Sequence, residues 1–331
     1  MQCHKGIGRA TAVLGFAWVA LATTSPAHAG SCASYGDRAW NGRYPYAKLA
    51  DADPHQQLNL DVWSAGSNWA GGWVELCSGA GSHRGWAFRG EWRVDGRIVQ
   101  AYPHVTRGWD WFQWLPHDRP DGDGFPLRVG HAGLYSKVRY ALGPLHGTFD
   151  VSYDIWLSDA RNPRPGDKLT EVMVWLDRGG GLKPLRNNSG YLGTTTLARV
   201  GGSWDVYAGS MRSTYRGVEM QWPVYSYVST RPVGRFDGDL QPFLWQVVHD
   251  FQHRAGVRSN AMNDRWYVLG VQFGAEPVAG HGQLDVRYYR VQAGTHAQGS
   301  FRQGAGAPSA ERPAPTRDAH RGRSARVQTT G

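Results

Sequence analysis

Acidic residues stand inside three apolar segments whose pattern is otherwise that of β-strands. Side chains alternate between the two faces of a strand, so in "TEVMVWLD" (170–177) Glu171 points away from the face that carries the valines. Asp154 has the same place in "VSYDIWLS" (151–158), and Glu276 has it in "WYVLGVQFGAE" (266–276). The three segments therefore predict three carboxylates on the face of a sheet that does not pack on the core.

Each strand is predicted to divide its side chains between a core face and an outer face. The core faces are Val172, Val174 and Leu176; Val151, Tyr153, Ile155 and Leu157; and Tyr267, Leu269, Val271 and Phe273. The outer faces are Glu171, Met173, Trp175 and Asp177; Ser152, Asp154 and Trp156; and Val268, Gly270, Gln272, Gly274 and Glu276. The two glycines remove side-chain bulk, as a surface must if a polymer is to lie across it.

Carboxylates on one face, beside tryptophan, suit the hydrolysis of a glycosidic bond. One carboxylic acid protonates the leaving oxygen, and a second carboxylate attacks the anomeric carbon or activates water. Aromatic rings supply a surface on which sugar rings stack, and the chain contains 16 Trp. The alternatives are that the extra Trp fill a large core, and that the three acids are unrelated surface carboxylates, since Asp and Glu usually lie outside.

The rest of the chain predicts the scaffold that positions these residues. Short alternating segments with turn residues between them recur throughout residues 30–292, as in "GTFDVSYDIWLSD", "SWDVYAG", "WPVYSYVS" and "GQLDVRYYRVQ". One segment, 239–256, has helical apolar spacing, with Asp239 able to cap its start and Gly256 to end it. The pattern predicts an all-β jelly-roll sandwich with one short helix packed on its convex side.

The N-terminal 29 residues have the features of a secretory signal peptide. Lys5 and Arg9 precede the apolar run "ATAVLGFAWVALA", and "AHA" (27–29) supplies the small residues that signal peptidase needs. The run is too short to cross a bilayer, and no later segment approaches that length. We expect a secreted protein, with no membrane contact after signal removal.

Cysteine usage fits the same compartment. Cys3 leaves with the signal, so Cys32 and Cys77 remain as an even pair that predicts one disulfide bridge. A lipid-modified Cys32 is the alternative, but "AGS" before it lacks the large aliphatic residue of such signals. Two thiols alone support a zinc site poorly.

The C-terminal residues 293–331 predict a disordered basic tail. They are rich in Gly, Ala, Pro, Ser and Arg and contain almost no large apolar side chain. Much of the formal net charge of +9 lies in this tail and in the signal, so the domain between them carries no basic helix or stripe. We therefore expect no nucleic-acid partner.

A Trp-rich loop, "RGWDWFQWLPHDRPDGDGFP" (107–126), interrupts the strand pattern. Exposed aromatic side chains are unfavourable without a ligand. The loop could border a binding cleft, or it could fold back over the sheet, and the sequence leaves both open.

At the acidic segments the chain resembles glycoside hydrolase family 12, the β-jelly-roll endoglucanases and xyloglucanases. "SYDIWL", "EVMVWL" and "GVQFGAEPVAG" match in order, and "AYPHV", "GGSWDVYAG" and "FDGDLQPF" look like the blocks between them. The likeness covers nearly all of residues 32–292. It implies a retaining, endo-acting hydrolase of β-1,4-glucan backbones (cellulose-type, mixed-linkage β-glucan or xyloglucan), with no metal or organic cofactor. We expect a monomer.

The resemblance also implies roles for individual residues. Glu171 matches the nucleophile, Glu276 the general acid/base and Asp154 the acid that tunes the nucleophile. Retention implies that the two glutamate carboxyls lie about 5–5.5 Å apart, that Glu276 holds a proton and that Glu171 is ionised. The predicted substrate-binding residues are Trp63, Met173, Trp175, Trp156 and Gln272. The family's early disulfide matches Cys32 and Cys77.

Three departures from the family pattern concern substrate preference. The usual Asn-x-Trp-Gly of an early cleft strand is Asp61-Val62-Trp63-Ser64 here, Ala275 stands where Thr is common, and the 107–126 loop is longer. A non-catalytic carbohydrate-binding sandwich and a jelly-roll xylanase are the competing interpretations. His249 and His253 have a spacing that could bind zinc, but no third ligand is evident and a polar helix face explains them better.

Overall fold

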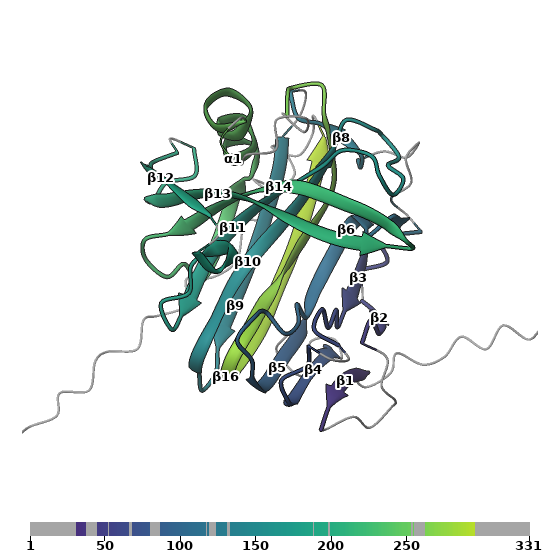
Figure 1. Cartoon of the computed structure of the whole chain (residues 1–331), viewed down its shortest axis with the longest axis vertical. Helices are drawn as coiled ribbons and strands as arrows, with labels where there is room; N and C mark the ends of the chain where they lie inside the picture. Colours follow the sequence, from purple (N-terminus) through teal and green to yellow (C-terminus); the bar gives the residue numbers. More distant parts are fainter. Residues whose placement is uncertain are drawn as a thin grey trace, which may run out of the picture.

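The computed structural model in Figure 1 describes most of the predicted domain. The described residues are 31–37, 45–51, 53–65, 68–79, 87–116, 118, 124–130, 133–187, 189–197, 199–252, 254 and 262–294. The predicted signal peptide and almost all of the predicted tail lie outside them. None of the helices within these ranges is long and apolar enough to cross a membrane.

The described chain is built mainly from β-strands, with a short 3₁₀ turn and one short helical segment formed by an α-helix and a π-helix. The early strands are β1 (Cys32–Gly36), β2 (Lys48–Ala50), β3 (Gln56–Asn59), β4 (Gly72–Ser78), β5 (Phe88–Asp95), β6 (His104–Asp110), β7 (Gln113–Trp114) and β8 (Leu127–Arg128). The later strands are β9 (Gly133–Leu142), β10 (His146–Ser158), β11 (Leu169–Gly179), β12 (Gly190–Thr195), β13 (Trp204–Tyr215), β14 (Val218–Ser229), β15 (Arg235–Asp239) and β16 (Tyr267–Gly294). The helical elements are η2 (Pro184–Asn187), α1 (Gln241–Gln246) and η3 (Val247–Phe251).

The 28-residue strand β16 connects the two parts of the sheet network. The main path of hydrogen-bonded neighbours is β1-β4-β5-β16-β10-β11-β14-β13-β12. The first half of β16 pairs with β6 and β10, and its second half pairs with β5 and β9. In Figure 1, β10, β11 and β16 run along the molecule while β13 and β14 run across it. Strand β16 is therefore the long element of the network, with β10 beside its first half and β11 on the other side of β10.

The side chains of the central strands separate into two apolar clusters, one on each face. The larger cluster is the main core and includes Val172, Val174 and Leu176 of β11 and Val151, Tyr153, Ile155 and Leu157 of β10. The smaller cluster includes Trp156, Met173, Trp175 and Trp222. The predicted core faces of β10 and β11 are therefore confirmed, and we call the opposite side, which carries the smaller cluster, the cleft face.

Two β-bulges make part of the predicted alternation wrong. Leu269 is an extra residue where β16 pairs with β10, so Tyr267 and Leu269 lie with the cleft-face cluster and Val268 in the core. Leu176 is the extra residue in β11, which brings Asp177 opposite the core residue Val151. Asp177 accordingly raises the pKa of the core residue Tyr140, although burial is the larger cause. A period of two cannot reveal a bulge, because one inserted residue reverses the alternation beyond it.

The helical segment lies on the side of the sandwich away from the cleft face, as predicted. Phe243 contacts Trp204 and Tyr227, both core residues, at ring-centroid distances of 5.0 Å. Asp239 was predicted to cap this helix, but the N-cap residue is Leu240; Asp239 Oδ1 accepts the Gln241 backbone N–H at 3.0 Å from one position earlier. The α-helix ends at Gln246 and continues as the π-helix η3 to Phe251, so it is shorter than the predicted 239–256. Gly256 lies outside the described residues.

The predicted disulfide is confirmed. Cys32 and Cys77 are directly opposite each other in the β1–β4 pair and are joined by their sulfur atoms. The bridge fixes the first described strand to the edge of the sheet. In the chain-entropy model a loop of this length contributes about 4 kcal/mol to stability.

Candidate active site

Three adjacent strands bring the predicted carboxylates together on the cleft face. Asp150, Ser152, Asp154 and Trp156 occupy alternate positions of the central strand β10. Glu276 of β16 is opposite Asp150, and Glu171 of β11 is opposite Trp156. Asp154, between these positions, is paired with Met173 on one side and Gln272 on the other. The two glutamates thus approach β10 from opposite sides, and Asp154 lies between them.

These carboxylates are almost completely removed from solvent. The exposed fractions of Asp154, Glu171 and Glu276 are 1%, 4% and 3%. Burial disfavours the charged form of a carboxyl group, and negative neighbours disfavour it further. The pKa of Asp154 is raised well above its ordinary value, first by burial and then by the charges of Glu171 and Glu276. The site therefore retains protons that exposed carboxyls would lose.

Glu171 has one strong hydrogen-bond donor. Trp222 Nε1–H of β14 donates to Glu171 Oε2 at 2.8 Å. Burial raises the pKa of Glu171 to about 7, and the bond from Trp222 opposes this rise because it stabilises the carboxylate. The bond from Trp222 holds the Glu171 carboxyl in one orientation and supports its ionised form, while burial opposes ionisation.

Glu276 faces Asp150 across the β10–β16 ladder. Burial raises the pKa of Glu276 well above its ordinary value, and the charge of Asp150 raises it further. Asp150 is fully buried, and burial likewise raises its pKa well above the ordinary value. Two buried carboxyls that face each other cannot both ionise easily, so the pair favours keeping a proton. A proton held at this position is what a general acid requires.

Asp150 was not identified from the sequence, although the period that places Asp154 and Ser152 on the cleft face also places Asp150 there. Trp222 was likewise missed, because "WPVYSYVS" predicted a strand and carried no sign of its contact with Glu171. Tyr102 also borders the site: its hydroxyl donates to the Ser152 carbonyl at 3.2 Å, and its pKa is raised by burial and then by the charge of Asp154.

The Trp-rich loop folds over the cleft face. Strands β6 and β7 pair as a hairpin whose tip is Trp111 and Phe112. The Trp111 ring lies 5.4 Å from that of Trp156 and 5.7 Å from that of Trp222, the residue that holds Glu171. Of the two alternatives that the sequence left open, the loop packs on the sheet, and it does so beside Glu171.

The hairpin tip is held in a strained conformation by its packing. Trp111 and Phe112 have φ values of 41° and 63°, which are unfavourable for large side chains. Phe112 also contacts Tyr215, at a ring-centroid distance of 4.9 Å. At the base of the hairpin Arg107 Nε donates to buried Asp118 Oδ2 at 2.9 Å. Contacts at both its tip and its base therefore hold the loop over the part of the cleft face that carries Glu171.

Gln272 lies on the cleft face, but both ends of its amide are engaged by protein groups. Trp156 Nε1–H donates to Gln272 Oε1 at 3.1 Å, and Gln272 Nε2–H donates to Asp110 Oδ1 at 3.1 Å. Lys48 Nζ bonds the other oxygen of Asp110 at 3.0 Å. The network fixes the Trp156 ring, so Gln272 positions an aromatic wall through these bonds.

Trp63 lies outside the regular strands, in the turn that follows β3, where a cleft strand was predicted. Its Nε1–H donates to Asp61 Oδ2 at 2.7 Å, and its ring lies 6.5 Å from that of Tyr102. Burial and then the charge of Asp110 raise the pKa of Asp61 to about 7. Asp61 also raises the pKa of Glu276, as the last of several contributions. The pair Asp61–Trp63 therefore belongs to the surroundings of the site.

The other predicted substrate-binding residues lie where the pattern put them. Met173, Trp156 and Trp175 belong to the cleft-face cluster and are almost fully buried. His249 stacks on Trp245 at a ring-centroid distance of 4.2 Å, and His253 lies outside the described residues. The stacking gives His249 a packing role on the helix.

Asp150 provides a test of how Glu276 keeps its proton. Replacing Asp150 by Asn removes the negative charge beside Glu276, so the pKa of Glu276 should fall. We expect the basic limb of the kcat/KM–pH profile to move to lower pH, with a smaller change in the acidic limb. Asp177→Asn, a carboxyl on the core side of β11, should leave the profile unchanged. An unmoved basic limb in Asp150→Asn would show that Asp150 does not control the proton of Glu276.

A β-sandwich whose central strands carry paired, buried carboxylates among tryptophans belongs to the class of jelly-roll glycoside hydrolases. A family model described as glycosyl hydrolase family 12 matches residues 134–293, which include Asp154, Glu171 and Glu276. The match confirms the resemblance to glycoside hydrolase family 12, the endo-β-1,4-glucanases and xyloglucanases, over this part of the chain.

Individual relatives agree with this assignment. Endoglucanase S of Pectobacterium parmentieri is 27% identical over 211 residues, which cover 62% of this chain and 70% of the relative. Xyloglucan-specific endo-beta-1,4-glucanase 1 of Phytophthora nicotianae is 29% identical over 147 residues, which cover 44% of this chain and 52% of the relative. The chain spans about half the length of the xyloglucan-specific relatives that it matches.

Solved structures confirm the predicted jelly roll. The family 12 xyloglucanase from Bacillus licheniformis superposes with a TM-score of 0.62 at 22% identity, covering 80% of this chain and 100% of that one. Endoglucanase 3 of Trichoderma harzianum gives a TM-score of 0.56 at 21% identity, covering 80% and 96%. At these identities the likeness establishes the fold.

Proposed function

We propose that this chain is a secreted, retaining endo-β-1,4-glucanase, with residues 30–292 as its catalytic domain. The observation that carries the proposal is that Glu171 and Glu276 are both buried on one face and differ in their surroundings. Glu171 accepts a hydrogen bond that limits the rise of its pKa to about 7, while burial and the charge of Asp150 raise the pKa of Glu276 well above its ordinary value. Two neighbouring carboxyls with pKa values raised by different causes can divide the roles of nucleophile and acid.

In the first step a Glu171 oxygen attacks the anomeric carbon of a glucose unit. The bond between that carbon and the glycosidic oxygen breaks, and its electron pair goes to the leaving oxygen. That oxygen takes the proton of Glu276, so the chain leaves as a neutral alcohol. Trp222 keeps the other oxygen of Glu171 hydrogen-bonded during the attack. The product is a glycosyl ester of Glu171.

In the second step Glu276, now a carboxylate, takes a proton from water. The water oxygen attacks the anomeric carbon, the ester bond breaks and Glu171 leaves as a carboxylate. Two inversions give net retention of the anomeric configuration, and Glu276 regains its proton. Asp150 assists this return, because its negative charge makes Glu276 a stronger base. Apart from the polysaccharide and one water molecule, the two steps use only side chains of this chain.

The polysaccharide class and the location follow from several observations together. The names of the relatives and structures describe endoglucanases and xyloglucanases, which act on β-1,4-glucan backbones. The cleft face offers tryptophans beside the carboxylates, and these suit stacking on glucose rings. The disulfide fits an oxidising compartment, and residues 1–29 fit a signal peptide. We propose export through that signal.

The test is reducing-end release from mixed-linkage β-glucan and from xyloglucan, assayed side by side with the mature secreted protein. We expect release from at least one of them, and proton NMR of the first product should show the β-anomer. The ratio of the two rates shows whether the cleft face accepts xylosyl branches. If neither polymer released reducing ends while the protein still bound them, this result would contradict the hydrolase and favour the non-catalytic carbohydrate-binding sandwich.

A further inference from the structure

A cavity lies on β4, β5 and β16, beyond the carboxylate site along the chain. Its volume is about 420 Å³, and it is lined by Trp73, Glu91, Trp92, Arg93, Pro144, His281, Gly282 and Gln283. None of these residues belongs to the carboxylate site. His281 follows Glu276 by five residues, which is roughly 16 Å along an extended strand.

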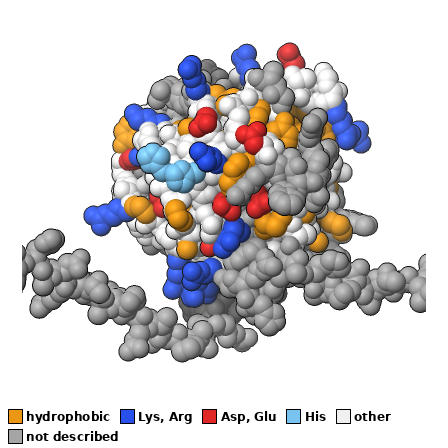
Figure 2. All heavy atoms as spheres, turned by 90° about the horizontal axis from the view of Figure 1, so that it is seen from below, with side chains coloured by type: hydrophobic (Ala, Val, Ile, Leu, Met, Phe, Trp, Pro, Cys, Tyr) orange, Lys and Arg blue, Asp and Glu red, His pale blue; other side chains and the backbone are white. Residues whose placement is uncertain are grey.

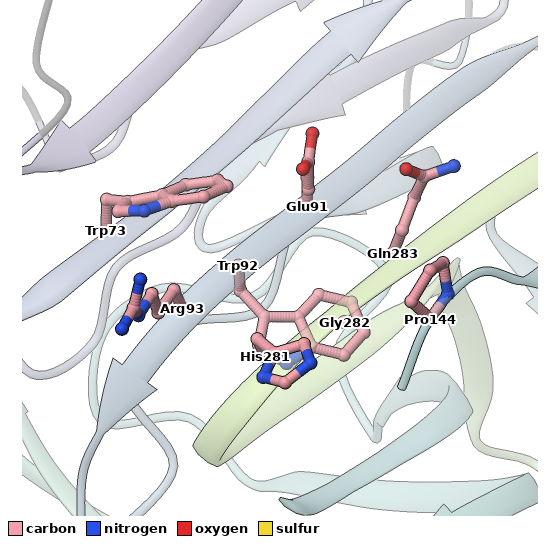
Figure 3. Close-up of a pocket in the computed structure, with 8 residues that line it drawn as sticks. All are labelled: Trp73, Glu91, Trp92, Arg93, Pro144, His281, Gly282 and Gln283. Carbon is pink, nitrogen blue, oxygen red and sulfur yellow. The ribbon is translucent and has the colours of Figure 1, made fainter. Parts of the chain in front are cut away.

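The strand register explains why these side chains meet. Trp73, Arg93 and His281 are cross-strand partners and form one row across three strands. Glu91 and Gln283 pair in the next row on the same face, two residues along each strand. Figure 3 shows Trp73 at one end of the cavity and Pro144 at the other, with the polar side chains between them.

The floor of the cavity is rigid and without projecting side chains. Gly282 has no side chain, and a Cβ added there would lie 2.5 Å from the Trp92 ring and 2.3 Å from Leu145 Cδ1. Trp92 is 1% exposed and fixed in the core. The cavity therefore keeps its shape without a ligand, which reduces the entropy cost of binding.

The polar groups of the cavity are available for a ligand. Within the described part of the chain, the side chains of Glu91 and Arg93 make no hydrogen bond or ion pair. Gln283 Nε2–H donates to Asp285 Oδ2 at 3.0 Å, which leaves its amide oxygen as an acceptor. Together these side chains offer planar donors and acceptors beside an aromatic ring.

The charge of the cavity selects the chemical class of that ligand. The lining carries one carboxylate and one guanidinium, and Glu75, the cross-strand neighbour of Glu91, adds a second carboxylate beside them. This disfavours a phosphate or an acidic polymer and leaves a neutral molecule as the ligand. Figure 2 views this lower end of the molecule and shows acidic, basic and histidine side chains interspersed, without a stripe of one sign. A neutral molecule that stacks on Trp and bonds through many hydroxyls is a sugar chain.

We propose that this cavity is a second carbohydrate-binding site that holds a neutral polysaccharide segment outside the carboxylate site. Trp73 supplies the stacking surface, and Glu91, Arg93 and Gln283 bond sugar hydroxyls. The choice of β-glucan as the ligand rests on the proposed function. The site retains the enzyme on a long chain while the cleft face acts on another part of it.

Binding is tested in the Glu171→Gln background, which prevents turnover, by retardation in native gels that contain xyloglucan or mixed-linkage β-glucan. Adding Trp73→Ala or Arg93→Ala should weaken retention about tenfold. Adding Trp245→Ala, which removes an exposed Trp on α1, should not. With Glu171 intact, Trp73→Ala should leave hydrolysis of a short chromogenic cello-oligosaccharide unchanged.

Arg93 is exposed, so its variant folds even if Trp73→Ala is unstable. The inference would be overturned if the gel retained Trp73→Ala and Arg93→Ala as strongly as the parent protein. It would also be overturned if the control Trp245→Ala lost as much retention as these two variants. Hydrolysis with unaltered retention would overturn the second site and leave the proposed function standing. If the protein hydrolyses neither glucan, gels with xylan and mannan are added. The site is supported if both variants are retained less than the parent protein by at least one of the four polymers. It is overturned if none of the four polymers retains the parent protein.

Discussion

Glu171→Gln should reduce kcat on β-glucan by about 10⁴-fold or more while the protein remains folded. The amide is nearly isosteric and can still accept the Trp222 N–H bond through its oxygen, but it cannot form the glycosyl ester. Reducing-end release measures the loss. Glu219→Gln, an exposed change in β14, is the matched control and should keep full activity.

The same variant has a stability signature with a definite sign. Burial raises the pKa of Glu171 from 4.5 to about 7, so the folded state holds this proton more tightly than the unfolded state does. A raised carboxyl pKa means that stability is lost as pH rises through this interval. Gln cannot titrate, so Glu171→Gln should gain melting temperature relative to the parent between about pH 4.5 and 7.

Two outcomes would contradict these expectations. Substantial turnover by a folded Glu171→Gln protein would exclude Glu171 as the nucleophile. A melting-temperature difference that does not change with pH would show that the carboxyl is ionised in the folded protein without cost. Polysaccharide binding by the variant, measured in the same preparation, shows that inactivity is not caused by unfolding.

The side of each strand could be predicted where the ladder is regular. On β10, Val151 to Leu157 alternate without interruption, and on β11 the same holds from Glu171 to Trp175. A buried face must be apolar at every second residue, so the acids could only lie on the other face. Glu171, Asp154 and Glu276 were placed correctly by this argument alone.

The prediction failed at the bulges, where local composition gives no warning. Leu269 and Tyr267 are as suitable for the core as Val268 is, and only the pairing with β10 decides which of them faces it. The position of Asp177 depends in the same way on the extra residue Leu176. These reversals arise from the register between strands, which is a property of tertiary structure.

Hydrogen-bond partners that lie far apart in the chain could not be predicted from the sequence either. Trp222 is 51 residues from Glu171, and Gln272 is 162 residues from Asp110. Asp150 stands at a position that alternation assigns to the cleft face, but its importance comes from the opposing Glu276. The sequence could therefore predict which residues face the cleft, and the structure supplies which of them control each other's protons.

Glu276→Gln should separate the two steps of the reaction. Without its acid the enzyme cannot protonate a sugar leaving group, so kcat on β-glucan should fall by about 10² to 10⁴-fold. An aryl cellobioside with a dinitrophenolate leaving group needs no proton for departure. On that substrate the first step should remain fast, and the second, which needs Glu276 as a base, should become slow.

We therefore expect a burst of about one equivalent of dinitrophenolate, followed by slow turnover, and a covalent glycosyl adduct on the peptide that contains Glu171. Azide attacks the adduct without a base, so it should accelerate turnover and yield a β-glycosyl azide. Glu171→Gln on the same substrate should give no burst and no response to azide. A burst in neither variant would contradict the ester intermediate. A full rate on β-glucan in Glu276→Gln would assign the acid to another carboxyl, with Asp150 the first candidate because it is buried and lies opposite Glu276.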